Sequence, residues 1–248
     1  MPADRSPKDL SNSATNWSLL EAASGHGADA RQGLEALTQR YWGPIFAFVR
    51  ATGQSSQDAV DLTQGFVADV LLGRSLLASA DRRRGRFRSL LRQSVVNYVR
   101  DRVRQQKSQK RQPSQGAPSH FGSAEIDDAA TKNFATAERA FDAHWAAQLI
   151  RTAAERAAQQ ARAEGHELAW TIFEQRTLRP RLLGEKPVEF AELLIQHDLA
   201  SVGQAAHLAI VGRRLFVDQL LTELRASLGE SESVADEIRL LLAAVEGV

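Results

Sequence analysis

Hydrophobic residues recur at three- and four-residue spacing along most of the chain, and strand-like alternation is nearly absent. This period is typical of amphipathic helices and predicts an all-α protein. The clearest run starts at Leu34 and predicts a helix that Gly53 closes. A second helix is expected after Ser55, which can cap it together with Asp58 three residues later. The apolar faces of these two helices contain Leu34, Leu37, Tyr41, Ile45 and Phe48, followed by Ala59, Leu62, Phe66 and Val70.

The same period predicts further helices on both sides of a stretch rich in Gly, Pro and Ser. Before that stretch we expect a short helix over 16–23, a short segment over 76–80 and a basic helix from about 85 to about 106. After it we expect helices over 137–163, from about 168 to 178–180, over 188–197 and from 201 to about 225. The last two are joined by a tight turn with Ser201 as the expected cap, which is the pattern of a helix-turn-helix.

Together these elements predict two helical domains joined by a flexible linker, the second ending in the helix-turn-helix. The first residues, 1–14, are expected to be disordered because they hold little to bury. The tail from Gly229 is acidic and ends in a short amphipathic stretch. The expected divisions are an N-terminal extension at 1–33, a first domain at 34–112, a linker at 113–133, a second domain at 134–228 and an acidic tail at 229–248.

Composition narrows the classes of protein that fit. The chain has no cysteine, which excludes disulfides and thiolate metal sites. No apolar run approaches the roughly 20 residues that span a bilayer, and the N-terminus lacks a signal-peptide core. We therefore expect a soluble cytoplasmic protein with no membrane partner. The six histidines are scattered without paired spacing, and no phosphate loop or nucleophile motif occurs, so no metal, cofactor or enzymatic activity is expected.

Charge is distributed unevenly. Residues 1–137 carry 19 basic and 13 acidic side chains, whereas residues 138–248 carry 12 basic and 17 acidic ones. The densest segment, 81–111, holds twelve basic residues against two acids. Such density is relieved by a phosphate backbone, which favours a nucleic-acid partner. At 100° per residue, one face of the basic helix carries Gln93, Asn97, Arg100 and Arg104, and the opposite face carries Phe87, Leu91, Ser94 and Tyr98.

Three features of this pattern leave alternatives open. Phe87 and Tyr98 can stack on an unpaired base or can belong to the core. Asp58 and Asp61 can cap their helix or meet a basic partner, and a metal-dependent nuclease would need a third ligand that is not nearby. The second helix of the helix-turn-helix can contact base edges or phosphates, or can serve packing alone. Its candidate contacts are Ser201, Gln204, His207, Arg213 and Arg214.

Taken together, several short motifs over about residues 15–112 resemble the second conserved region of extracytoplasmic-function sigma factors of bacterial RNA polymerase. The helices from about 188 to 225 look like the fourth conserved region of that family. After the Gln of the second helix the family usually carries Glu, where this chain has Gly65. The motifs are Trp17-Ser18-Leu19-Leu20, Arg40-Tyr41-Trp42-Gly43-Pro44, the segment 58–64, Arg84-Gly85-Arg86-Phe87-Arg88-Ser89-Leu90-Leu91 and Gln109-Lys110-Arg111.

The resemblance implies a sigma factor that binds core RNA polymerase and promoter DNA, and an anti-sigma or other regulatory protein is a further candidate partner. It implies polymerase binding by Asp58, Asp61, Leu62, Gln64 and Phe66. It implies minus-ten element binding and DNA opening by Arg86, Phe87, Arg88, Gln93, Asn97, Tyr98, Arg100 and Arg104. It implies minus-thirty-five element binding by Ser201, Gln204, His207, Arg213 and Arg214.

Two alternative functions remain from the sequence. In a divergent relative, the last domain would bind a regulatory protein through an apolar surface around Ala206, Ile210 and Val211, which stand where the family usually carries basic residues. A plain nucleic-acid-binding protein without a polymerase contact is the other alternative.

Overall fold

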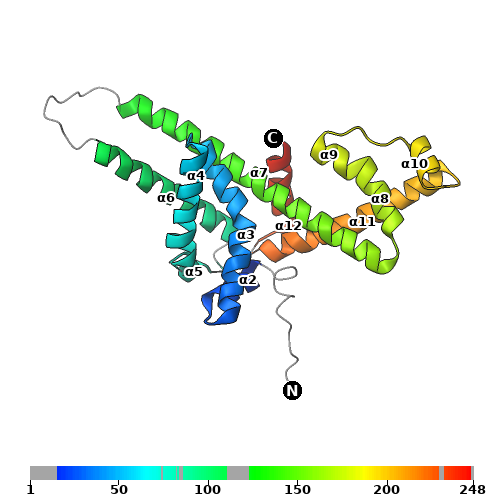
Figure 1. Cartoon of the computed structure of the whole chain (residues 1–248), viewed down its shortest axis with the longest axis horizontal. Coiled ribbons are helices and arrows are strands. Elements are labelled where there is room, and N and C mark those ends of the chain that lie inside the picture. Colours follow the sequence, from blue (N-terminus) through cyan, green and yellow to red (C-terminus); the bar gives the residue numbers. More distant parts are fainter. Residues whose placement is uncertain are drawn as a thin grey trace, which may run out of the picture. The chain divides into compact units, whose positions relative to one another are not determined.

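A computed structural model describes residues 16–73, 75–81, 83, 86–110, 123–228 and 232–246, with the backbone alone described at 16, 75, 106–110, 123–133 and 246. Throughout these ranges the chain is almost entirely helical and contains no strand, which confirms the all-α prediction (Figure 1). The predicted disordered segment 1–14 and most of the stretch rich in Gly, Pro and Ser lie outside the described residues, as do Arg82, Arg84 and Gly85 of the basic segment.

The chain divides into two compact units. Unit 1 comprises residues 1–148 and 226–248, and unit 2 comprises residues 149–225. This division differs from the expected one, which placed the boundary in a linker at 113–133 and left 229–248 as a separate tail. The acidic C-terminal segment belongs to unit 1, which also contains the basic segment 81–111.

Unit 1 is built around helix α3 (Ala28–Ala51), whose predicted apolar face is buried. α2 (Asn16–Ser24) packs on it through Leu19 and Leu20, each 3 % exposed. The region 16–33, expected as an extension, is therefore part of the unit. The other elements of unit 1 are α4 (Ser56–Phe66), the π-helical η1 (Val67–Leu72), α5 (Ser75–Ser79), α6 (Phe87–Lys110), the first part of α7 (Ser123–Glu164) and α12 (Val234–Glu246).

The predicted boundary between the first two long helices is confirmed. Gly53 has a φ of 90°, a left-handed conformation that favours glycine, and it follows the end of α3. The side chain of Ser55 then caps α4, since its hydroxyl accepts a hydrogen bond from the Asp58 backbone N–H at 3.1 Å and donates to the Asp58 carboxylate at 2.6 Å. These contacts fix the point at which α4 begins.

The long helix α7 starts at Ser123, fourteen residues before the predicted start at 137. The Gly and Pro residues of the preceding stretch end at Gly122, and the next residues are rich in Ala, Asp and Glu without a helix breaker. The expected linker at 113–133 is therefore helical from 123 onward. The segment 123–133 contains too few apolar residues to show a helical period, which misled the sequence prediction here.

Unit 2 contains the second part of α7 with α8 (Glu167–Phe173), the π-helical η3 (Glu174–Leu178), α9 (Arg179–Leu183), α10 (Phe190–Gln196) and α11 (Val202–Ser227). Pro180 was expected near a helix end, but it lies in the first turn of α9, where a missing backbone N–H costs nothing. A core cluster of unit 2 contains Ala157, Ala161, Trp170, Phe173, Leu178 and Leu215.

Small residues let the helices of unit 2 approach closely. A side chain at Gly212 of α11 would place its Cβ 2.3 Å from the Ala169 carbonyl oxygen and 2.6 Å from the Phe173 Cβ, both on α8. Polar contacts join α7 to α11, since Arg156 pairs with Glu223 and the Gln219 amide donates to Gln160 at 2.8 Å. α11 is thereby held along its length, which fixes the face it presents outward.

Candidate nucleic-acid interface

One face of α6 presents a row of hydrogen-bond donors. Gln93, Asn97, Arg100 and Arg104 are all exposed. The Gln93 amide donates to Asn97 at 3.1 Å, and the Arg100 guanidinium lies 4.8 Å from the ring centroid of Phe134. Among the described residues, neither Arg100 nor Arg104 is paired with a carboxylate. The structure thus places the four residues of the predicted stripe on one accessible surface.

The opposite side of α6 is packed into unit 1. Leu91, Val95 and Val99 are at most 1 % exposed, and Phe87 is equally buried. Its ring meets that of Tyr41 edge to face, with the centroids 5.5 Å apart. Of the two interpretations left open by the sequence, the structure therefore shows Phe87 as a core residue whose ring is not available to a base.

Tyr98 lies between the two faces and is held by its neighbours. Its hydroxyl donates to Asp69 at 3.1 Å, and Asp69 also pairs with Arg102 at 2.7 Å. Its ring packs edge to face on Phe66 at 5.5 Å. Partial burial raises the pKa of the Tyr98 phenol, which keeps it a hydrogen-bond donor. Tyr98 is partly exposed, so it remains a candidate base contact at the rim of the surface.

The Tyr98 phenol lies against Gly65 of α4. A Cβ at Gly65 would lie 2.5 Å from the Tyr98 hydroxyl oxygen, so any side chain there must displace the phenol. The glycine and the tyrosine therefore form a matched pair in this chain.

Three arginines at and near the start of α6 are engaged by acids of unit 1. The Nε of Arg86 lies 3.0 Å from Glu232 and 2.9 Å from Glu237. Arg88 pairs with Glu237 at 3.4 Å and with Asp142 at 3.3 Å. Asp142 also accepts a hydrogen bond of 2.6 Å from Arg92. Two of the three carboxylates come from the C-terminal segment and the third comes from α7.

This cluster, which we call the arginine–acid cluster (Arg86, Arg88, Arg92, Asp142, Glu232 and Glu237), is largely shielded from water. Arg88 is 7 % exposed and Glu237 is 1 % exposed. The Arg88 guanidinium also lies 3.8 Å from the ring centroid of Trp145. Burial lowers the pKa of Arg88 and raises that of Glu237, and in each case the partner charges oppose the shift. Arg88 is therefore committed to the interior of the protein rather than to a surface contact.

The outer side of α4 is acidic. Asp58, Asp61 and Gln64 are exposed, and Gln57 donates to Asp61 at 3.3 Å. Leu62 is half-buried. Phe66, also predicted to bind polymerase, is 1 % exposed and belongs to the core. The accessible part of the predicted polymerase site is therefore mainly polar, and Asp58 lies in the first turn of the helix, where the helix dipole favours a carboxylate.

In unit 2, the five predicted contacts to the minus-thirty-five element are exposed on α11 and its preceding turn. Ser201 caps the helix by accepting from the Gln204 backbone N–H at 3.2 Å, and the Gln204 side chain accepts from the Ala200 N–H at 2.9 Å. The predicted cap is confirmed. The side chains of Ser201 and Gln204 are thus used in capping the helix. The other three predicted contacts, His207, Arg213 and Arg214, take no part in the cap.

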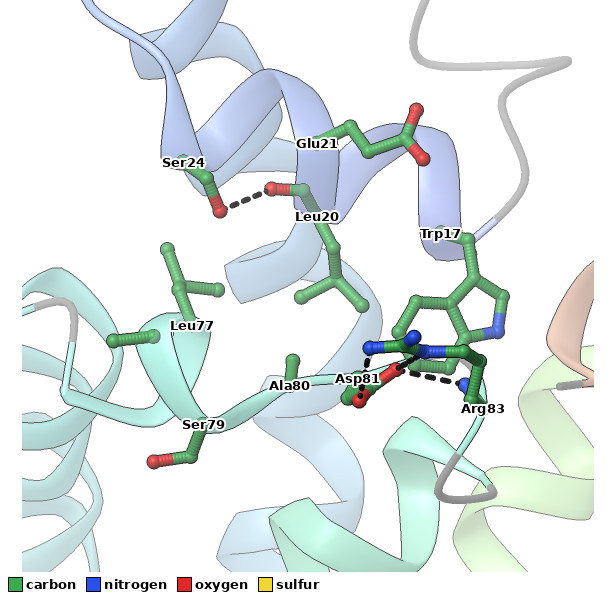
Figure 2. Close-up of a pocket in the computed structure, with 10 residues that line it drawn as sticks. Trp17, Leu20, Glu21, Ser24, Leu77, Ser79, Ala80, Asp81 and Arg83 are labelled. Carbon is green, nitrogen blue, oxygen red and sulfur yellow. Dashed lines mark hydrogen bonds and ion pairs between the residues drawn. The ribbon is translucent and has the colours of Figure 1, made fainter.

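A hollow of about 900 Å³ lies in unit 1 between α2, α5 and the start of the basic segment (Figure 2). Leu20 and Leu77 contribute apolar walls. Its charged wall is internally paired, since Arg83 lies 3.2 Å from Asp81 and its backbone N–H donates to the same carboxylate at 2.9 Å. The dashed lines in Figure 2 mark these contacts. The Asp81–Arg83 contacts stabilise a local turn of the backbone, and the hollow is not assigned a catalytic role.

Among the described residues, no group of three or more His, Cys, Asp or Glu residues could hold a metal ion. Within the same part of the chain, no helix combines the length and apolar character that crossing a bilayer would need.

The arginine–acid cluster was missed by sequence reasoning. Its acids stand far from α6 in the chain, at 142, 232 and 237. The available signal was the excess of acids after residue 137 beside an excess of bases before it.

Comparison with known proteins found no relative of this chain. No protein-family model, no curated protein and no solved structure matches it.

Proposed function

We propose that the chain is a sigma-like transcription initiation factor, which binds core RNA polymerase through α4 and promoter DNA through α6. The observation that carries the proposal is the exposed row Gln93, Asn97, Arg100 and Arg104 on a helix whose other side is buried. The row spans about 16 Å at 1.5 Å per residue, the length of about five nucleotide steps. Its two cations suit phosphates and its two amides suit base edges.

The acidic outer side of α4 supports the second part of the proposal. Asp58, Asp61 and Gln64 offer carboxylate and amide groups to a basic partner surface, while the apolar face of the same helix is used inside unit 1. Promoter DNA is repelled by these carboxylates, so α4 and α6 suit different partners. This separation favours a factor that bridges polymerase and DNA. Such a factor acts by binding and not by catalysis.

The proposal is tested by run-off transcription with bacterial core polymerase and a library of promoter DNA. Arg100→Ala/Arg104→Ala is expected to reduce transcription at least about tenfold, because each lost charged contact is worth about 1–3 kcal/mol. The charge-matched control Arg31→Ala/Arg162→Ala changes two exposed arginines outside α6 and should leave transcription within about twofold. Normal transcription by the α6 variant would refute the assignment of that helix.

Polymerase binding needs its own assay. Asp61→Lys reverses an exposed charge on α4 and is expected to weaken pull-down of core polymerase without weakening DNA binding. If the chain retains salt-sensitive DNA binding but captures no polymerase, it is a plain nucleic-acid-binding protein.

A second candidate function concerns unit 2. α11 exposes the apolar side chains Val202, Ile210 and Val217, which are 49 %, 51 % and 40 % exposed. This surface favours a regulatory protein over DNA as the partner of α11. Arg213→Ala/Arg214→Ala discriminates the two: reading of a minus-thirty-five element requires these cations, so transcription falls, whereas a protein-binding α11 leaves transcription unchanged.

A further inference from the structure

The C-terminal segment reaches the start of the helix proposed to bind DNA. Its residues Glu232 and Glu237 are both ion-paired with Arg86, immediately before α6. α12 is anchored there by Leu241, which is 5 % exposed, and by Glu237, which is 1 % exposed. The contact lies within unit 1.

The position of Arg86 connects this contact to the exposed row. Counting along a helix, Arg86 precedes Gln93 by seven residues, and the row continues at 97, 100 and 104. Arg86 is the residue directly before α6, and its backbone carbonyl accepts hydrogen bonds from the Ser89 and Leu90 N–H groups of the first turn. It thus adds one cation at the N-terminal end of the helix that carries the row, and its side chain is only 18 % exposed beside the two glutamates.

The carboxylates of Glu232 and Glu237 occupy the place that phosphates would take. Arginine attracts both groups through its charge, and here the Arg86 Nε and the Glu237 Oε2 are ion-paired at 2.9 Å without a hydrogen bond. A buried carboxylate is costly without its partner, so Glu237 remains in place only while Arg86 and Arg88 face it. A phosphate that competes for Arg86 therefore weakens the binding of α12 to the rest of unit 1. Conversely, dissociation of α12 exposes Arg86.

We propose that residues 232–246 form an intramolecular clamp, which covers Arg86 and lowers the affinity of α6 for DNA until α12 is released. The inference rests on the proposed DNA binding by α6. Release frees Arg86 and removes one of the two acids of Arg88, which keeps Asp142 and the Trp145 ring. By thermodynamic linkage, if release strengthens DNA binding, then DNA binding must promote release.

Thiol labelling tests that linkage directly, because the chain has no cysteine. In the full-length Leu241→Cys variant, the new thiol lies on the buried side of α12. It therefore reacts with a thiol reagent only when α12 leaves the rest of unit 1. A fluorescein-labelled single-stranded DNA of about 20 nucleotides, long enough to cover the row, should accelerate labelling at least about fivefold at low salt. Val49→Cys, at a fully buried position of α3, is the control for global unfolding and should not respond to DNA.

DNA affinity gives an independent measurement. Glu232→Gln/Glu237→Gln removes the competing charges and should tighten binding of the same oligonucleotide about five- to tenfold. One or two added phosphate contacts should also steepen the dependence of log K on log salt by about 0.7 each. Glu21→Gln/Glu35→Gln removes two exposed acids of unit 1 outside the clamp and controls for net charge. Adding Arg86→Gln to the first variant should cancel most of its gain.

If the double glutamine variant does not fold, Glu232→Gln alone, at a side chain that is 14 % exposed, provides the milder form. DNA binding that leaves Leu241→Cys labelling unchanged would overturn the clamp while leaving the proposed function intact. An equal gain from the Glu21→Gln/Glu35→Gln control would overturn it as well. If no variant binds DNA at low salt, the proposed function fails and the clamp fails with it.

Discussion

The two ends of α6 carry the same side chain in opposite environments. At the start, Arg86 and Arg88 are surrounded by carboxylates, and Arg88 is almost inaccessible to water. Toward the other end, Arg100 and Arg104 are exposed and have no carboxylate partner among the described residues. A uniform run of positive charge in the sequence thus conceals two roles. The first end holds the fold of unit 1 together, and the second is available to a polyanion.

The largest expected effect comes from removing a cation at the buried end. Arg88→Ala leaves Glu237 with fewer partners and Asp142 with only Arg92, and breaking a buried pair costs about 3–5 kcal/mol. Arg100→Ala removes an exposed guanidinium near one aromatic ring, which should cost less than about 1 kcal/mol. Urea unfolding followed by circular dichroism measures both free energies.

A matched pair of substitutions sharpens this prediction. Arg88→Met/Glu237→Met removes both charges, so no isolated ion is left inside, and it should recover most of the stability lost in Arg88→Ala. Equal, small losses in Arg88→Ala and Arg100→Ala would contradict the distinction between the two ends of the helix.

The two tyrosines of the chain report on the same distinction at high pH. Tyr41 packs on Phe87 at the buried end, and complete burial raises its pKa to about 12. Between pH 10 and 12 the unfolded chain loses the phenolic proton while the folded chain keeps it. Stability should therefore fall as pH rises through this window, by about 1.4 kcal/mol per pH unit and about 2–3 kcal/mol in all.

Tyr41→Phe isolates this contribution, since the Tyr41 hydroxyl has no hydrogen-bond partner among the described residues and its removal costs little at neutral pH. The variant should lose less stability than the parent between pH 10 and 12, and Tyr98 serves as a reference present in both. Parallel stability curves for the two proteins would show that Tyr41 ionises without constraint.

Local pattern predicted much of unit 1. The period of Leu37, Tyr41 and Ile45 gave a buried helix face, and the Ser55–Asp58 spacing gave a cap, because both depend on residues close together in the chain. The exposure of Gln93, Asn97, Arg100 and Arg104 also follows from helical spacing. These features need no knowledge of the tertiary structure.

Long-range pairing could not be predicted in the same way. Arg88 and Arg100 have equal charge and similar neighbours in sequence, so only the arrival of Asp142, Trp145 and Glu237 separates them. The return of α12 to unit 1 likewise depends on packing partners distant in the chain. Periodicity reports which face is buried, but it does not identify what buries it.

The smallest expected effect concerns the ion pair between Arg102, which lies at the exposed end of α6, and Asp69 of η1. Asp69 and Arg102 are 2.7 Å apart, but their side chains are 53 % and 43 % exposed, so water screens the charges. Asp69→Asn should cost less than about 1 kcal/mol, and the loss should shrink in 1 M salt. Asp142→Asn, the same change beside Arg88 and Arg92, should cost several times more and respond less to salt, because its pairs are better shielded. Urea unfolding at both salt concentrations measures the two losses. Equal losses would mean that burial does not separate the arginines of α6, and the exposed row would then lose its claim to a separate role.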